Sequence, residues 1–174
     1  MSWSIDPAHT RVQFAARHLM VSTVRGEFKA FSGEVEFDPA RPEATRVSVD
    51  VQTASVNTND AKRDGHLASA DFFEAAVHPS MTFRSTRVDG VKGEHARLTG
   101  DLTIKGVTHP VTLDVTFHGL AKAPWGTTSA GFEAKGKLNR RDWGLTWNMP
   151  LETGGVLVGD EITLTIDAEI VKQA

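Results

Sequence analysis

Apolar and polar residues alternate along six segments of this chain, and this period of two is the feature that most constrains its fold. Successive side chains of a β-strand point to opposite faces of a sheet, so each alternating segment is expected to be a strand with one buried face. The inward-facing sets are Val12, Phe14, Ala16 and His18; Val47, Val49 and Val51; Ala96, Leu98, Gly100, Leu102 and Ile104; Val111, Leu113, Val115 and Phe117; Ala130, Phe132, Ala134, Gly136 and Leu138; and Ile162, Leu164, Ile166, Ala168 and Ile170. The alternation predicts an all-β protein.

Small residues interrupt these inward-facing sets, which bears on what fills the interior. A closed barrel of about eight strands is just wide enough to be filled by side chains or to hold one small ligand. Inward alanine and glycine residues, among them Ala16, Ala134 and Gly136, favour the second arrangement. We therefore expect a β-barrel with an unfilled apolar interior, and we expect its function to reside there.

Turn residues divide the chain into strands that are expected at about residues 11–18, 47–51, 81–88, 94–105, 108–118, 127–138 and 160–172. A further bent stretch covers residues 24–37. The alternation changes parity within it, which indicates a bulge or corner near Ser32-Gly33. Neighbouring strands are expected to be antiparallel, because the connections between them are short.

Residues 57–76 break the alternation and favour a short helical insertion, at about residues 60–75. Asn59 or Asp60 can cap a helix, because a short oxygen-bearing side chain accepts hydrogen bonds from the first free amides. Asp71 can cap a second helical piece that carries Phe72 and Phe73. We expect the insertion to lie across a barrel opening or on the barrel wall.

Length and charge exclude several classes of protein. The 174 residues suffice for one domain with a sizeable core, so we expect residues 1–174 to form a single domain. The 19 basic and 22 acidic residues nearly balance, which disfavours a nucleic-acid binder. The sequence shows neither a secretory signal nor the roughly 20 apolar residues of a membrane span. We expect a cytoplasmic protein without an integral membrane segment, or a periplasmic one if a leader has been removed.

The sequence contains no motif that predicts catalysis or metal binding. The seven histidines form neither a His-x-His nor a His-Glu-x-x-His ligand pair. A Gly-x-Ser-x-Gly nucleophile elbow and the nucleotide-binding fingerprints are missing, and cysteine is absent. We therefore expect no catalytic residues, no metal and no cofactor.

Three features leave structural and functional interpretations open. His18 shares the inward parity of Phe14, so it is either a buried imidazole with a hydrogen-bond partner or a polar contact for a ligand head group. The mixed-charge clusters 62–64 and 140–142 are either solvated rims or an anion-binding mouth, because the fork of an arginine suits a diphosphate. Residues 139–148, with Trp143, Leu145 and Trp147, form either an aromatic plug or the apolar wall of a cavity mouth.

From Trp3 to about Lys172, the chain resembles the YceI-like, polyisoprenoid-binding family of lipocalin-like proteins. The resemblance rests on many blocks in the family's order. They are WSIDPAHT (3–10), RHLMV (17–21), GEF (26–28) with FSG (31–33), NDAKRDGHL (59–67) with DFF (71–73), HPSMTF (78–83), GDLTIKGVT (100–108), NRRDWGL (139–145) and LETGGVLVGDE (151–161).

The resemblance implies an extended, eight-stranded antiparallel lipocalin-like barrel that binds a long isoprenoid, such as a polyprenyl phosphate, a polyprenyl diphosphate or a quinone tail. It also implies the possibility of a homodimer. The tunnel lining of the family maps by motif onto Phe14, His18, Phe28, Phe72, Phe73, Phe83, Trp143 and Leu145. The head group is expected near the rim residues Arg140, Arg141, Lys62 and Arg63.

Two other functions compete with non-enzymatic carriage or storage of such a lipid. An enzyme acting on the lipid head group would use His18 as its acid or base. A stress-response or scaffold protein would have a filled barrel, in which Ala16, Ala134 and Gly136 face large partners. The small inward residues and the family resemblance favour the carrier.

Overall fold

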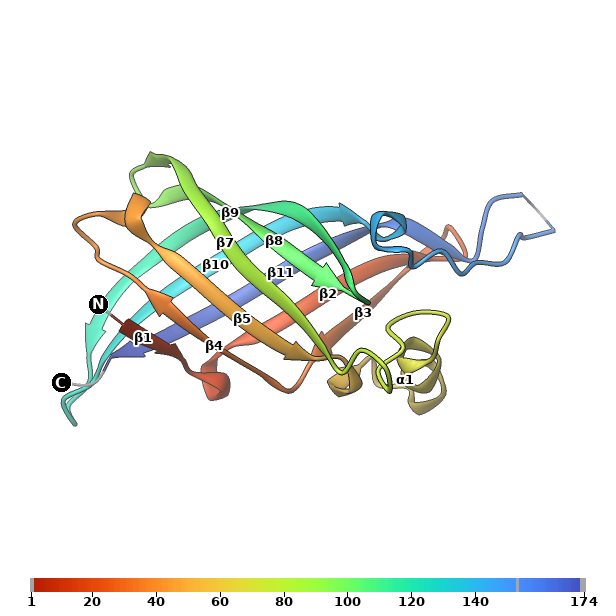
Figure 1. Cartoon of the computed structure of the whole chain (residues 1–174), viewed down its shortest axis with the longest axis horizontal. Coiled ribbons are helices and arrows are strands. Elements are labelled where there is room, and N and C mark those ends of the chain that lie inside the picture. The colour runs from red at the N-terminus through yellow and green to blue at the C-terminus, as the bar shows by residue number, and fades with distance from the viewer. Residues whose placement is uncertain (1, 153, 173–174) are drawn as a thin grey trace.

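A curved antiparallel sheet makes up most of the protein, whose computed structural model describes residues 2–152 and 154–172 (Figure 1). The strands are β1 (Ser2–Ile5), β2 (Arg11–His18), β3 (Ser22–Phe28), β4 (Phe31–Glu36), β5 (Arg46–Gln52), β6 (Val56–Asn57), β7 (Ser80–Lys92), β8 (His95–Ile104), β9 (Val107–Lys122), β10 (Thr128–Asn139) and β11 (Val158–Lys172). Neither β1 nor β6 was predicted, because strands of 4 and 2 residues are too short to show an alternation.

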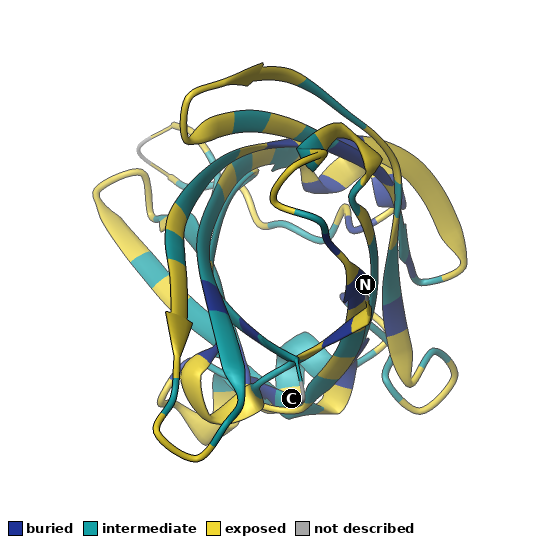
Figure 2. Ribbon diagram, turned by 90° about the vertical axis from the view of Figure 1, so that its left-hand side faces the viewer, coloured by how far each residue is buried: buried dark blue, intermediate teal, exposed yellow. Residues whose placement is uncertain are grey.

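Eight strand positions close this sheet into a barrel, because pairs of short consecutive strands share three of the positions. Both β1 and β2 lie against β11, with Ile5 opposite Ile170 and Phe14 opposite Leu164. β4 pairs with β1 and β3 with β2, while β6 follows β5 along the chain and pairs with β3. Seen from the end that carries the termini, the strands form a ring (Figure 2). The predicted eight-stranded antiparallel barrel is confirmed for the described part of the chain.

A bulge or corner was predicted near Ser32-Gly33, and the structure has a corner between β3 and β4 at Lys29 and Ala30, two residues earlier. The amide of Lys29 donates to Ser55 O, and Ala30 O accepts from the amide of Gln52, so both residues leave the regular ladder. Gly33 remains in the ladder, opposite Val49. A Cβ atom on Gly33 would lie 2.6 Å from Ser48 O and 2.7 Å from Ile5 Cδ1, so this glycine makes room for the backbone of β5 and for a side chain of β1.

The helical insertion is confirmed as α1 (Ala61–Ala68), which lies at the barrel end opposite the termini (Figure 1). Asp60 caps it by accepting hydrogen bonds from the amides of Lys62 and Arg63. The second helical piece that was predicted after Asp71 is wrong, because residues 70–73 form turns. The Asp71 carboxylate instead lies 2.9 Å from His66 Nε2, so it is not free to act as a cap.

Buried apolar residues form two clusters along the barrel. One cluster, near the termini, contains Trp3, Val35, Phe37, Ala130 and Ile170. Trp3 Nε1 donates to Phe37 O at 3.0 Å, so β1 is fastened to the end of its neighbour β4. The second cluster surrounds the rest of the interior and includes Phe28, Phe72, Trp143 and Leu145. Among the described residues, no helix has the length and apolar composition needed to cross a membrane.

Candidate functional site

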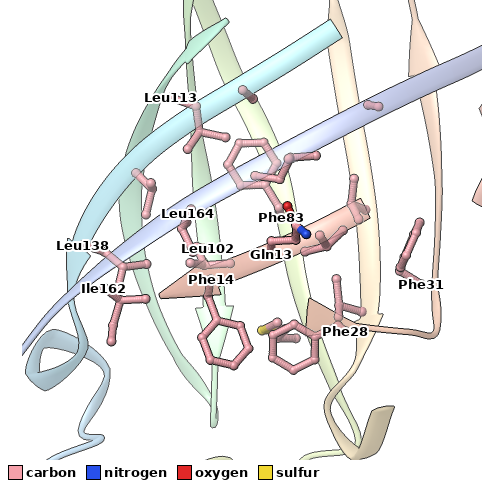
Figure 3. A pocket seen from close by; sticks show the side chains of 18 of the residues that line it. Gln13, Phe14, Phe28, Phe31, Phe83, Leu102, Leu113, Leu138, Ile162 and Leu164 are labelled. Atoms are coloured by element: carbon pink, nitrogen blue, oxygen red, sulfur yellow. The ribbon is translucent and has the colours of Figure 1, made fainter. Parts of the chain in front are cut away.

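A cavity of about 790 Å³ occupies the barrel interior (Figure 3). Small-molecule sites commonly have volumes of about 300–1,000 Å³, so the space suits a ligand. Within residues 2–152 and 154–172, the wall includes every member of the predicted inward-facing sets except Gly100, Ala130 and Gly136. The predicted strand parity and the predicted unfilled interior are therefore confirmed. We call this cavity the tunnel, because its wall runs from the β7–β8 hairpin to α1.

Glycines widen the tunnel indirectly. A Cβ atom on Gly26 would lie 2.5 Å from Phe14 Cζ, and one on Gly136 would lie 2.6 Å from Leu113 Cδ2. On Gly100, a Cβ atom would collide with the Phe83 ring. Each of these large side chains thus lies over a glycine on an adjacent strand instead of standing out into the lumen. The glycines leave no space at their own positions, but they let the larger side chains lie against the wall.

All eight residues that the family resemblance assigned to the tunnel lie in its wall. Phe14, Phe28 and Phe73 form a row, with ring centroids 5.5 Å apart in both contacts. Figure 3 shows Phe14 and Phe28 close together on the neighbouring strands β2 and β3. These rings therefore form a continuous aromatic row along part of the tunnel wall. Their role in binding a ligand stays a prediction.

Residues 139–148 combine features of an aromatic plug and of an apolar cavity wall, the two roles that the sequence left open. Trp143 is buried, and its Nε1 donates to Leu102 O at 2.8 Å, so the segment is anchored to β8. Leu145 and Trp147 line the tunnel. The Trp147 ring centroid lies 4.5 Å from that of His66 on α1, which in turn contacts the Phe72 ring at 5.1 Å. The segment thus covers part of the barrel end beside α1 and forms part of the tunnel wall.

Arg140 differs from an exposed rim residue because it is only 4% exposed. Its guanidinium donates hydrogen bonds to four backbone carbonyl oxygens, those of Leu145, Trp147, Val158 and Gly159. Burial lowers the pKa of this guanidinium, while the carboxylate of Asp160, 3.6 Å from Nη2, acts in the opposite direction. Arg140 therefore ties the segment after β10 to the start of β11.

The other predicted rim residues differ in their access to the tunnel. Lys62 and Arg63 line it at α1, whereas Arg141 lies outside its wall. The Arg63 guanidinium donates to both Thr58 Oγ1 and Thr58 O at 2.8 Å. Lys62 is exposed, so its ammonium group is the rim cation best able to meet a ligand.

His18 lines the tunnel at the end of β2 and is half-buried. Among the described residues, no protein group forms a hydrogen bond with its imidazole; Ser22 Oγ donates to the backbone oxygen of His18 instead. This disfavours the interpretation of His18 as a buried imidazole with a protein partner. It leaves a polar group exposed to the lumen.

One cluster that the sequence analysis did not find lies outside the barrel. Asp6, His9 and Glu169 bring one potential metal ligand each to within 4.8 Å of one another. The hydrogen bond between Asp6 and His9, 2.8 Å long, lowers the pKa of Asp6 and raises that of His9. Glu169 is distant in sequence, so only the pairing of β1 with β11 could reveal this cluster. The three side chains already form an ionic contact with one another.

Comparisons with known proteins agree with this geometry. The family model described as the YceI-like domain matches residues 3–170. Protein YceI of Escherichia coli O157:H7 is 43% identical over 165 residues, which cover 95% of this chain and 83% of that protein. The crystal structure of BcnA from Burkholderia cenocepacia has a TM-score of 0.80 at 27% identity, covering 95% of this chain and 98% of that one. A polyisoprenoid binding domain from Saccharophagus degradans, implicated in plant cell wall breakdown, shares the fold with a TM-score of 0.68 at 16% identity, covering 97% of each chain.

Proposed function

The chain belongs to the YceI-like family, and from this membership we propose that it binds a long isoprenoid lipid in its tunnel and carries or stores it without changing it chemically. The single observation that carries this proposal is the apolar cavity of about 790 Å³ that runs through the barrel. The binding activity in the name of the Saccharophagus degradans domain, which has the same fold, supports an isoprenoid as the ligand.

The shape of the tunnel favours a chain over a compact molecule. β11 has 15 residues and therefore extends over roughly 50 Å at about 3.4 Å per residue. With a strand tilt of about 35–45°, the barrel is roughly 35–40 Å long. A long and narrow apolar space of this kind suits a polyprenyl chain or a quinone tail.

Hydrophobic transfer supplies enough free energy for such a ligand. Burial of one CH₂ group contributes about 0.8 kcal/mol, so the five carbons of one isoprene unit contribute roughly 4 kcal/mol. Association costs about 4–15 kcal/mol in lost translational and rotational freedom. About four buried isoprene units therefore suffice to offset this cost, so a long isoprenoid is favoured over a short one.

The proposal puts the polar head group at the mouth beside α1, where Lys62 and Arg63 line the tunnel. A phosphate or diphosphate there would meet the exposed Lys62 ammonium, and His18 would offer a polar contact. A general base usually has a second group that orients it, and His18 has no such protein partner among the described residues. Binding without chemistry is therefore favoured over the enzyme hypothesis.

Two substitutions on one strand test the proposal. Ala16 lines the tunnel, whereas the adjacent Ala15 points to the other face of β2. Ala16→Phe should block the lumen and abolish lipid retention, while Ala15→Phe should retain it. Native mass spectrometry of protein purified without detergent measures the bound lipid. A wild-type protein that carries no lipid and also rejects added polyprenyl phosphates and quinones would contradict the proposal.

A further inference from the structure

The tip of the β2–β3 hairpin exposes three consecutive apolar side chains. Leu19, Met20 and Val21 are 40%, 54% and 78% exposed, and Met149 is exposed as well. Single exposed apolar residues are ordinary on protein surfaces, but a continuous run of them is a feature of interaction sites. We call Leu19, Met20 and Val21 the apolar tip.

The protein holds the apolar tip in a fixed and unfavourable conformation. Leu19 and Met20 have φ angles of 52° and 65°, in the left-handed region that residues other than glycine rarely adopt. The amide of Leu19 donates to Leu157 O at 2.8 Å, and Arg17 Nη2 donates to Met20 O at 3.3 Å. Such local strain persists only where surrounding contacts maintain it, and it is concentrated at functional positions.

The apolar tip lies beside the mouth of the tunnel. Arg17 and His18, which directly precede it, line the tunnel, and so does Leu157, which binds its backbone. Figure 1 shows this hairpin at the same end of the barrel as α1, opposite the termini. Whatever contacts the apolar tip is therefore brought close to the mouth.

Charge around the apolar tip favours an anionic surface. Arg17 and Arg25 flank the apolar tip on β2 and β3, and residues 12–26 contain no acidic residue. The carboxylates of Asp160 and Glu161 on the adjacent β11 already form ion pairs with basic side chains. On nearby α1, the Asp60 carboxylate accepts from helix amides and Asp64 Oδ1 accepts from Thr58, so both acidic groups have partners within the protein. Basic residues that flank exposed apolar ones are the combination that binds the interface of an anionic bilayer.

We propose that the apolar tip, together with Met149, docks the tunnel mouth onto an anionic lipid bilayer. This inference rests on the proposed function, because a lipid that is insoluble in water has to enter the tunnel from a membrane or leave it for one. A protein partner is less favoured, because a stable protein–protein interface covers about 800 Å² on each side, whereas three side chains at a hairpin tip offer much less area.

Vesicle flotation tests the docking surface. Wild-type protein should float with vesicles of phosphatidylcholine and phosphatidylglycerol, and less with vesicles of phosphatidylcholine alone. Val21→Ser should weaken the binding roughly tenfold, the factor that corresponds to one buried valine side chain. Trp125 is 80% exposed on the β9–β10 hairpin at the opposite end, so Trp125→Ser is the control and should leave binding unchanged.

Equal binding of wild type and Val21→Ser, or loss of binding in Trp125→Ser alone, would overturn the docking surface. Thermal unfolding of each variant shows whether it remains folded. A second measurement separates this inference from the proposed function: uptake of a polyprenyl phosphate from detergent micelles, followed by native mass spectrometry. Val21→Ser should load normally from micelles. If the wild type floats but takes up no lipid from micelles, the proposed function fails and the docking surface stands.

Discussion

Substitution of Gly26 by alanine should narrow the tunnel without unfolding the barrel. Gly26 pairs with Phe14 across β2 and β3, and the atoms nearest to a new Cβ would be Phe14 Cζ at 2.5 Å and Thr58 Cγ2 at 2.8 Å. Both are ends of side chains, so the backbone need not move. The Phe14 ring would have to leave the wall and turn into the lumen.

The cost to stability should be small. Overpacking costs about 1–3 kcal/mol, while replacing glycine in a strand recovers roughly 0.5–1 kcal/mol of conformational entropy. The net loss of about 1 kcal/mol corresponds to a decrease in Tm of roughly 2–4 °C for a chain of this size. In the tunnel, a ring that displaces two or three lipid methylenes should cost about 2 kcal/mol, or roughly a 30-fold loss of affinity.

Competition binding with a fluorescent polyprenyl phosphate, combined with thermal unfolding, measures both effects. Gly65 is the matched control, because a Cβ atom there meets no atom within 4 Å, and Gly65→Ala should leave affinity unchanged. Adding Phe14→Leu to Gly26→Ala should restore part of the affinity, since the shorter side chain clears the lumen. If Gly26→Ala lowers Tm as expected but binds lipid like the wild type, the idea that glycines set the width of the tunnel is refuted.

Two further predictions concern stability. Arg140→Ala should lower the free energy of unfolding by about 3 kcal/mol or more, because it leaves several carbonyl oxygens without their donor. Urea denaturation measures this loss, and a loss below about 1 kcal/mol would contradict the prediction. His9 contacts Asp6 and Glu169, and these contacts raise the pKa of His9. The stabilisation of the fold by protonated His9 is therefore complete below pH about 6.5 and is lost as the pH rises through the pKa of His9 in the folded protein. The lowered pKa of Asp6 means that stabilisation is also lost as the pH falls below about 4. The difference in unfolding free energy between wild type and His9→Ala should therefore be largest between these limits, and a difference that does not vary with pH would rule out this contact as its source.

Patterns that depend on neighbouring residues could be predicted reliably from the sequence. The pleat of a strand fixes which side chains share a face, so alternation identified the tunnel wall along β2, β8, β9, β10 and β11 before any strand was paired. The N-cap of α1 at Asp60 was predictable for the same reason, because the capped amides follow it directly.

Features that depend on distant partners could not be predicted. The corner at Lys29 is decided by Ser55, and Asp71 is diverted from capping by His66. Arg140 resembled a rim cation because its four carbonyl acceptors lie 5 to 19 residues further along the chain, in the segment after β10 and at the start of β11. In each case the hydrogen-bond partner lies at least five residues away, beyond the two or three residues over which capping and strand alternation act.

The sequence by itself determined the all-β class, the inward face of most strands, the short helix and the family. Only the tertiary structure decided that the interior is open, because the same inward side chains can fill a barrel or line it. The physical reason is that the direction of each large side chain depends on the residue beside it on the next strand. Phe14 lies over Gly26 and Leu113 over Gly136, and these neighbours meet only when β2 pairs with β3 and β9 pairs with β10.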